Sequence, residues 1–379
     1  MPTINAIHVR GEFVGALSAA IITLPMAIGY GVSAFAPLGK EFFPTAALIG
    51  LNAAIIGGFF AALLGGTPAQ ISGPKAPLTL ILASVVITLV SGAHLAPQLS
   101  SKASVIVGLT MICVFIGGVA QILFGYFKLG NIVKYVPHPV VAGFMNGIAL
   151  LLIWKQLPAL FGLQAGTGLK EILAESTLMN PVSLITGLVT VLSIFLSRTY
   201  IKRVPSLLFG FLSGTGVYLV IWLVFKSPSN SPVIGDLHAS IPGPVAFVHL
   251  FHQIQSVISP ALISELVAYG IVLGLIGSME SLFSSVVMDS LNSRRHDSNR
   301  ELVGQGVGNV IASFFGALFT AASIPRSVAN FRAGARNRLS GMLCSFLILI
   351  IFLTMAPLIG RIPLAVFSGI IIAVGINLF

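Results

Sequence analysis

The chain has 379 residues, of which 56% are hydrophobic and only 8% are charged, and its formal net charge is +10. Soluble domains carry about 25% charged residues, so this composition excludes a soluble globular protein and indicates a polytopic membrane protein. The two cysteines, Cys113 and Cys344, both lie in apolar runs. We therefore expect them to be small core residues rather than part of a disulfide framework.

Apolar runs along the chain predict twelve segments of membrane scale, because a membrane-spanning helix needs about 20 mostly apolar residues. The runs fall at residues 12–38, 44–64, 71–93, 104–127, 136–160, 181–197, 204–225, 259–289, 302–320, 322–332, 337–358 and 363–379. The third and the tenth begin with polar sequence that Gly and Pro interrupt. The polar N-terminus leads directly into the first run, which predicts a start anchor rather than a cleaved signal peptide.

The Lys and Arg residues indicate how these segments cross the membrane. With a cytoplasmic N-terminus and alternating crossings, twelve of them fall inside: Arg10, Lys128, Lys134, Arg198, Lys202, Arg203, Arg294, Arg295, Arg300, Arg332, Arg336 and Arg338. Six fall outside: Lys40, Lys102, Lys155, Lys170, Lys226 and Arg361. This excess of cytoplasmic cations follows the positive-inside rule, so it explains the positive net charge without a nucleic-acid partner.

Two of the 20 cations, Lys75 and Arg326, remain inside predicted spans, where each costs about 2.5–3.5 kcal/mol at the bilayer centre. Lys75 ends the sequence SGPK at residues 72–75, and Arg326 ends SIPR at residues 323–326. Both are Ser-x-Pro-cation units, and they open the third and the tenth segments. Because the tenth segment comes seven crossings after the third, an odd number, the two units cross in opposite directions, which indicates an inverted-topology repeat.

The repeated unit predicts two half-helices that begin near the middle of the membrane, one from each side. Pro suits the first turn of a helix, and the Ser two residues earlier can cap free backbone amides. The polar lead-ins must be extended and buried by neighbouring helices. The two N-termini would then face each other and form an anion site, strengthened by Lys75 and Arg326. The alternatives are that a cation snorkels to an interface or pairs with a carboxylate for structure alone.

One acid, Glu280, lies near the middle of the eighth segment, in the stretch IGSMESLFSSVVMDSL. A buried carboxylate there can carry a coupling proton, bind Na⁺ or neutralise a cation such as Arg326, and the sequence leaves these alternatives open. Ser281 and Ser284 offer hydroxyls beside it. The alternative for Ser281 and Ser284 is that each hydroxyl bonds only to a backbone carbonyl of its own helix, as is common for Ser in helices.

The first segment has Pro25 in mid-span, which predicts a kinked helix that lines a cavity. Met26 and Tyr30 share one face of that helix, with core packing as the alternative. Other chemistries lack support, since the sequence has no Walker A motif and no Cys/His cluster with metal-ligand spacing, and no Ser-His-Asp arrangement can be argued from it. We therefore expect a protein that is not an enzyme.

Three stretches make the sequence resemble a known family: GGTPAQISGP, VPHPVVAGFMNGIALLL, and the run from HDSNRELVGQGVGNVIASFFG to SIPRSVANFRAGARNRLSGM. It resembles the SulP (sulfate permease) family of anion transporters from Gly11 to Phe379. The resemblance implies an all-α polytopic membrane fold with a seven-plus-seven inverted repeat and two half-helices. This chain ends at about the twelfth segment, so the family's last two segments and its cytoplasmic STAS domain are expected to be missing.

The resemblance also implies a core domain that moves against a gate domain like an elevator. Residues 1–135, with segments one to four, and residues 259–360, with segments eight to eleven, would form the core. Residues 136–258 would form the first part of the gate, and residues 361–379 would begin its truncated second part. We expect a homodimer in a bacterial plasma (inner) membrane, with the lipid bilayer around it and the N-terminus in the cytoplasm.

The site residues follow from the repeated unit and from the positions that match the family's motifs. The predicted substrate-binding residues are Met26, Tyr30, Ser72, Gly73, Lys75, Ser323 and Arg326. The predicted ion-coupling residues are Glu280, Ser284 and Ala322. No cofactor or metal is expected apart from a coupling ion, H⁺ or Na⁺, and Na⁺ would lie at Glu280, Ser284 and Ser323.

Three residues depart from the family pattern. Met26 stands where many members have Gln, and Lys75 stands where the residue is usually uncharged. Glu280 stands where bicarbonate-transporting members have Asp. Those members also lack the arginine that this chain has at position 326. We therefore expect a secondary active transporter of a sulfate-like oxyanion, coupled to H⁺ or to anion exchange. The alternatives are a Na⁺/bicarbonate symporter and a passive anion channel, and chloride or a dicarboxylate are further candidate substrates.

Overall fold

The computed structural model describes residues 6–91, 103–130, 138–163, 179–201, 205–225, 231–238 and 259–377. Its helices are α1 Ala6–Phe35, α2 Phe43–Asn52, α3 Gly58–Leu64, α4 Ala76–Val90, α6 Ala103–Tyr126, α7 His138–Leu160, α9 Pro181–Tyr200, α10 Ser206–Phe225, α12 Pro260–Asn292, α13 Ser298–Phe314, α14 Ile324–Arg332, α15 Leu339–Gly360 and α16 Leu364–Ile376. A π-helical turn, Ala53–Gly57, joins α2 to α3. Two short strands, β1 (Ser72–Pro74) and β2 (Thr320–Ala322), precede α4 and α14.

Helices lie at each of the twelve predicted segments within the part of the chain that the structure describes. Seven of the described helical stretches are long and apolar enough to cross a membrane. The predicted half-helices α4 and α14 have only 15 and 9 residues, and each follows a strand. The first segment, α1, is helical for 30 residues and continues through Pro25.

The ninth segment is the one whose bounds differ most from the prediction, which placed it at 302–320. Asp297 caps α13 four residues earlier, because its Oδ1 accepts a hydrogen bond from the amide of Arg300 at 3.0 Å. The helix ends at Phe314, and the chain turns at Gly316, whose φ of +62° suits a residue without a Cβ. The apolar residues after that turn belong to β2 and to the segment that leads into it rather than to a helix.

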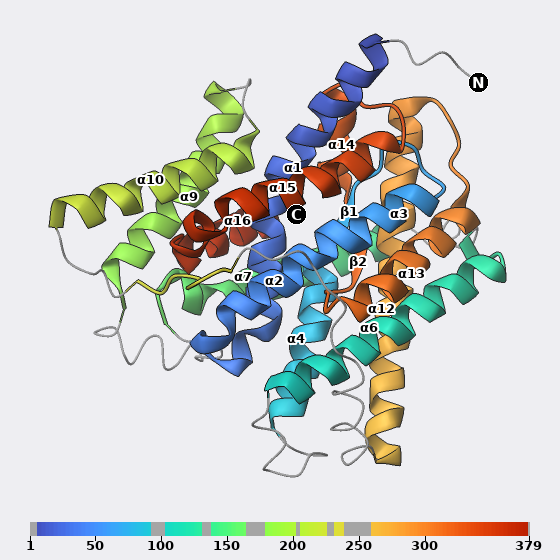
Figure 1. The fold of residues 1–379 in the computed structure, drawn as a ribbon, viewed down its shortest axis with the longest axis horizontal. Coiled ribbons are helices and arrows are strands. Elements are labelled where there is room, and N and C mark those ends of the chain that lie inside the picture. Colours follow the sequence, from blue (N-terminus) through green and yellow to red (C-terminus); the bar gives the residue numbers. More distant parts are fainter. Residues whose placement is uncertain are drawn as a thin grey trace.

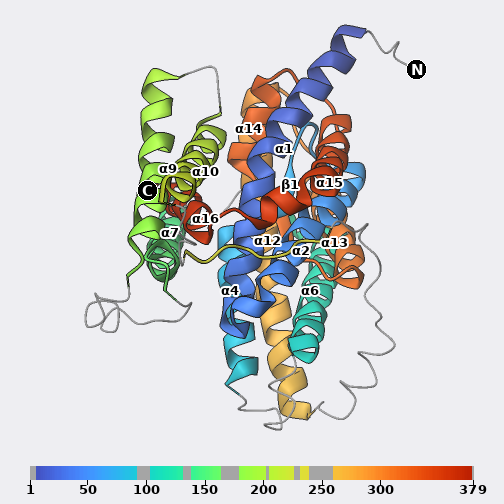
Figure 2. The ribbon, with the colours of Figure 1, turned by 60° about the vertical axis from the view of Figure 1, so that its left-hand side comes forward.

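The helices form two groups, which Figure 2 shows side by side. α7, α9, α10 and α16 pack against one another on one side of the molecule. The other group, which includes α1, α4, α6, α12, α13, α14 and α15, surrounds β1 and β2. The division of the chain into core and gate domains stays a prediction, but its proposed gate helices within the described residues all lie in the first group.

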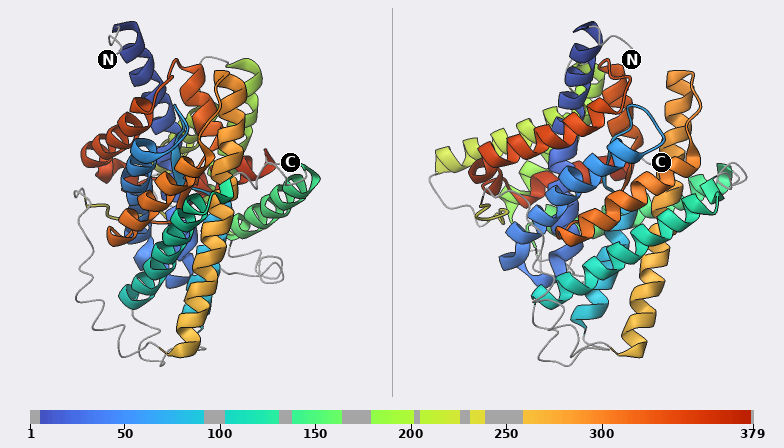
Figure 3. Two further views of the ribbon diagram at one scale, coloured as in Figure 1. Left: turned by 90° about the vertical axis from the view of Figure 1, so that its right-hand side faces the viewer. Right: turned by 45° about the vertical axis from the view of Figure 1, so that its right-hand side comes forward.

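α6 and α13 run side by side along much of their length (Figures 1 and 3). A Cβ on Gly306 of α13 would lie 2.6 Å from the carbonyl oxygen of Gly118 on α6, so only glycine permits this approach. α13 is thereby held next to the segments that lead into both strands. Cys113 on α6 and Cys344 on α15 are buried and free, as the sequence predicted.

Candidate functional site

The two lead-ins before the half-helices pair with each other inside the larger group of helices. The strands are antiparallel, in the register Ser72 to Ala322, Gly73 to Ala321 and Pro74 to Thr320. Every residue of both strands is buried. The pairing satisfies backbone groups that have no water to bond in an apolar interior. The predicted extended and buried lead-ins are therefore confirmed.

The half-helices leave this strand pair in opposite directions, α4 downward and α14 upward in Figure 2. Their N-cap residues, Lys75 and Ser323, both have extended backbone. No described side chain caps either helix, so the predicted capping by Ser72 and Ser323 is wrong. Ser72 Oγ instead accepts a hydrogen bond from Gln305 Nε2 at 2.6 Å. Both helix starts therefore keep amide donors and a positive dipole end, which attract anions.

Arg326 lies in the first turn of α14 and is fully buried, with 0% of its surface exposed. Its Nη2 donates to the carbonyl oxygen of Pro74 at 2.6 Å. Its Nε and Nη1 have no hydrogen-bond partner among the described residues. A buried guanidinium with two unused donors is costly in an apolar interior. A bound oxyanion would accept from both nitrogens in a bidentate contact and remove that cost.

Gly73 makes room for this guanidinium, because a methyl group on Gly73 would overlap Arg326 Nη1. We expect Gly73→Ala to displace the guanidinium and lower the affinity for an oxyanion at least about tenfold, because a hydrogen bond to a charged group contributes about 1.5–3 kcal/mol. Calorimetric titration of the purified variant measures the affinity. Gly147→Ala on α7 is the control, since a Cβ there meets nothing described within 4 Å. Equal affinities in the two variants would contradict the role of Gly73.

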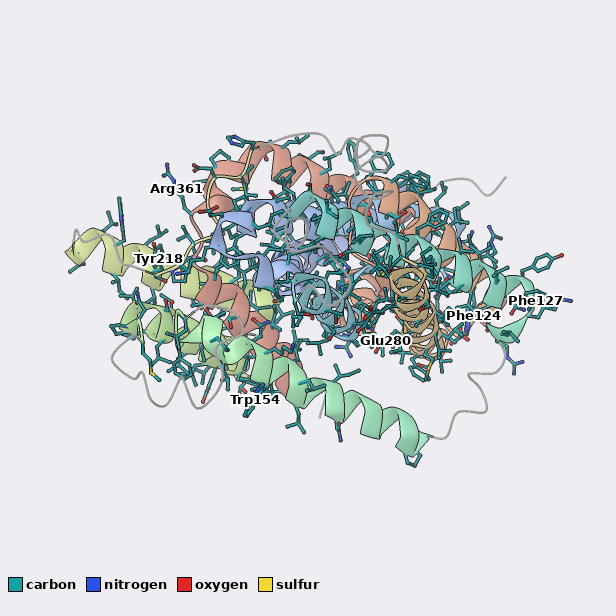
Figure 4. The ribbon with its side chains drawn as sticks, turned by 90° about the horizontal axis from the view of Figure 1, so that it is seen from below. Phe124, Phe127, Trp154, Tyr218, Glu280 and Arg361 are labelled. Carbon is teal, nitrogen blue, oxygen red and sulfur yellow. The ribbon has the colours of Figure 1, made fainter. Side chains whose placement is uncertain are left out.

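Lys75 and Glu280 form an ion pair between the start of α4 and the middle of α12. Their side chains are 13% and 4% exposed. Figure 4 shows Glu280 beside α12 among packed helices, whereas Trp154 lies at the edge on α7. The acid therefore pairs with Lys75, and the sequence-based alternative of a structural pair with Arg326 is wrong. Within the described residues, Glu280 Oε1 and the buried Ser284 Oγ have no hydrogen-bond partner.

α1 contributes Tyr30 and Met26, which are 1% and 2% exposed. The helix that carries them, α1, packs against α14 and β1. Met26 precedes Tyr30 by one helical turn on the same face. The structure thus buries the predicted residues of the first segment in the helix that packs against the lead-in strand β1 and the half-helix α14.

Backbone amides of the predicted ion-coupling segment hold β2 in place. The amide of Ala322 donates to Ser281 Oγ at 3.2 Å, and the amide of Ser323 donates to the carbonyl oxygen of Ile71 at 2.9 Å. Ser281 Oγ also donates to the carbonyl oxygen of Gly277 at 2.8 Å. The Ser281 hydroxyl therefore bonds to backbone groups. The sequence analysis gave backbone bonding as the alternative to a functional role. The functional roles assigned to Ala322, Ser323 and Ser284 stay predictions.

Comparison with known proteins identifies the fold that carries this arrangement. A sequence profile described as the Sulfate permease family matches residues 9–379. The chain belongs to the sulfate permease family. The bicarbonate transporter BicA of Picosynechococcus sp. is 34% identical to it over 100% of this chain and 64% of the relative. The putative sulfate transporter YvdB of Bacillus subtilis is 30% identical over 90% of this chain and 62% of the relative.

This sulfate permease family member also resembles a solved structure, the transmembrane domain of a cyanobacterial bicarbonate transporter, BicA. The TM-score is 0.83 at 32% identity, covering 99% of this chain and 89% of that domain. The all-α inverted-repeat fold is therefore confirmed, and so is a transporter family rather than an enzyme family. The chain spans less than two-thirds of the length of the curated relatives named above.

The sequence analysis missed a polar stripe on α13, formed by Glu301, Gln305 and Asn309 at every fourth position. Glu301 is 1% exposed and accepts four hydrogen bonds. Its Oε2 accepts from the amides of Gly66 and Thr67 at 2.8 and 2.9 Å. Its Oε1 accepts from the side chains of Gln70 and Gln305 at 2.7 and 2.8 Å. The spacing of polar residues on an otherwise apolar helix was the signal that could have revealed the stripe.

The stripe holds both lead-ins of the family's half-helices. Gln305 reaches β1 through Ser72, as described above. Asn309 Oδ1 accepts from the amide and the hydroxyl of Thr320 in β2 at 2.7 and 2.9 Å. Asn309 Nδ2 donates to the carbonyl oxygen of Thr320 at 3.0 Å and to Gln121 Oε1 at 2.8 Å. α13 is therefore the element that sets the positions of β1 and β2, and through them those of Lys75 and Arg326.

A Ser-His-Asp chain, which the sequence did not predict, closes the turn between α12 and α13. Asp289 Oδ2 lies 2.7 Å from His296 Nδ1, and His296 Nε2 lies 2.9 Å from Ser298 Oγ. Asp289 Oδ1 also accepts from the backbone amide of His296 at 2.8 Å. All three residues lie within ten positions of one another. These hydrogen bonds therefore stabilise the local turn.

Proposed function

We propose that this chain is a secondary active transporter of small oxyanions such as sulfate, working by an elevator-type alternating-access mechanism. The observation that carries the proposal is the fully buried Arg326 at the start of one half-helix, with two donors unpartnered within the described residues. The second half-helix starts beside it, across the strand pair. The names of the relatives, a bicarbonate transporter and a putative sulfate transporter, support an anion as the substrate.

The charge of the site favours a dianion. Lys75 and Glu280 neutralise each other, which leaves the single positive charge of Arg326. Each helix N-terminus adds the equivalent of about half a positive charge, so the site carries roughly two positive charges in all. Sulfate balances that charge, whereas bicarbonate or chloride leaves about one positive charge uncompensated in an apolar interior. We therefore propose sulfate or a similar dianion as the preferred substrate.

We propose that transport is coupled to H⁺ or to exchange for a second anion. The ion pair between Glu280 and Lys75 supports this, because an acid that already has a cation has less need of Na⁺. The second candidate is a Na⁺/bicarbonate symporter, which the 34% identity to BicA favours. The third candidate function is a passive anion channel, which uncoupled currents in planar bilayers would identify.

An ion-substitution uptake assay on the reconstituted protein separates these functions. We expect saturable sulfate uptake that an inward H⁺ gradient or internal sulfate accelerates and that replacement of Na⁺ by choline leaves unchanged. Bicarbonate should compete weakly. Bicarbonate uptake with a strict requirement for Na⁺ would instead establish the symporter, and currents without saturation would establish the channel.

The arrangement in the membrane is part of the same proposal. We propose a homodimer in a bacterial plasma membrane, with the N-terminus in the cytoplasm, and the excess of cytoplasmic cations supports that orientation. A cysteine placed at position 10 should react with impermeant maleimide only after the cells are opened. Native mass spectrometry of the detergent-extracted protein should give twice the mass of one chain.

A further inference from the structure

The charge of Glu280, on which the proposed coupling depends, must be balanced inside the protein. Its carboxyl group is buried in the middle of α12, where the residue is 3% exposed. A carboxylate in such a place needs a cation or a proton, since an unpaired charge in an apolar interior is very costly. A transporter can take that cation from solution at each cycle, or the chain can supply it.

This chain supplies it from Lys75. Lys75 is the N-cap residue of α4, and its carbonyl oxygen accepts from the amide and the hydroxyl of Thr79 at 2.9 and 2.8 Å. Pro74 on its other side belongs to β1. The backbone of Lys75 is thus fixed by the half-helix on one side and the strand pair on the other. Its ammonium group, 13% exposed, reaches Glu280 from that fixed position.

We infer that Lys75 is a tethered counter-cation for Glu280, which makes anion transport independent of Na⁺ or another small cation at this acid. The inference rests on the proposed transport function and reassigns Lys75 from substrate ligand to a residue that determines the coupling ion. Arg326 keeps two donors unpartnered within the described residues and is left to bind the anion. The charge of Lys75, by contrast, is already matched by Glu280.

Removing the tether should create a requirement for Na⁺. Lys75→Met keeps a long unbranched side chain but loses the charge, so Glu280 becomes an unpaired carboxylate that a small cation can neutralise. We expect its sulfate uptake in choline buffer to fall at least about tenfold below that of the wild type, because breaking a buried pair leaves an uncompensated charge. Adding Na⁺ should restore uptake in this variant and have no effect on the wild type.

The double variant Lys75→Met/Glu280→Gln is the matched test, because it removes both charges together. Its exchange of external for internal sulfate, measured without an H⁺ or Na⁺ gradient, should return to within about threefold of the wild type and lose the Na⁺ requirement, as expected for two residues that act on each other. Lys155→Met is the control, since Lys155 lies exposed on α7. A purely structural role of Lys75 would lower protein yield but would not create a Na⁺ requirement.

Two outcomes would overturn the inference. One is uptake by Lys75→Met equal to that of the wild type without Na⁺. The other is a loss that neither Na⁺ nor the second substitution reverses, which would make Lys75 a substrate ligand. If the wild type itself takes up neither sulfate nor bicarbonate, the proposed function fails. The role of Lys75 as counter-cation is then tested by the melting temperature. Na⁺ should raise the melting temperature of Lys75→Met and leave that of the wild type unchanged, because an ion that binds only the folded protein stabilises it.

Discussion

Replacing Arg326 with alanine is expected to weaken sulfate binding about 100-fold, because two charge-assisted hydrogen bonds and the main positive charge of the site are lost. The helix itself should remain, since Arg326 makes one described hydrogen bond, to the carbonyl oxygen of Pro74. Calorimetric titration of the detergent-purified variant with sulfate measures the loss. Circular dichroism confirms that the helical content is unchanged.

Two further variants make this result specific. Arg326→Lys keeps the charge but loses the planar fork of donors, so its affinity should lie between those of the wild type and Arg326→Ala. Arg332→Ala removes an exposed cation from the last turn of the same helix and should bind like the wild type. Arg326→Ala with an affinity close to that of the wild type would disprove the assignment of the anion site.

Replacing Glu301 with alanine should destabilise the protein more than any change at the anion site. The substitution leaves two backbone amides and two glutamine side chains without their acceptor. Each buried donor left without a partner costs about 1–3 kcal/mol, so we expect a loss of at least about 3 kcal/mol even if water replaces some of the bonds. The midpoint temperature of thermal aggregation, followed by size-exclusion chromatography, should fall accordingly.

Sulfate affinity of Glu301→Ala should fall as well, because the segment before β1 loses its attachment to α13. Glu41→Ala is the matched control, since Glu41 is exposed in the turn between α1 and α2. A midpoint temperature of Glu301→Ala equal to that of Glu41→Ala would show that the polar stripe does not hold the strand pair.

The sequence predicted the arrangement of the half-helices because that arrangement is encoded locally. The Ser-x-Pro-cation unit occurs twice, Pro sets the start of each helix, and a polar lead-in within an apolar protein can only be extended and buried. The antiparallel pairing of β1 with β2 follows from the inverted repeat. The same reasoning placed Arg326 at the centre of the site, and the structure brings it to the carbonyl group of Pro74.

The partners of the charged residues could not be predicted in the same way. Glu280 could have paired with either cation, since both open predicted spans, and the choice of Lys75 depends on how α12 packs against α4. Capping by Ser72 was a reasonable local expectation, but Gln305 on α13 binds its hydroxyl from 233 positions away along the chain. Long-range packing of this kind leaves no signal in a short stretch of sequence.

The central claim is that an oxyanion binds between the starts of α4 and α14, against Arg326. The most direct test is a structure of the purified protein with selenate, which has the charge and tetrahedral shape of sulfate and scatters anomalously. We predict one selenium peak beside Arg326 at the junction of the two half-helices, placed so that selenate oxygens lie within hydrogen-bond distance of Arg326 Nε and Nη1. A selenium peak elsewhere, with none at that junction under saturating selenate, would contradict the account.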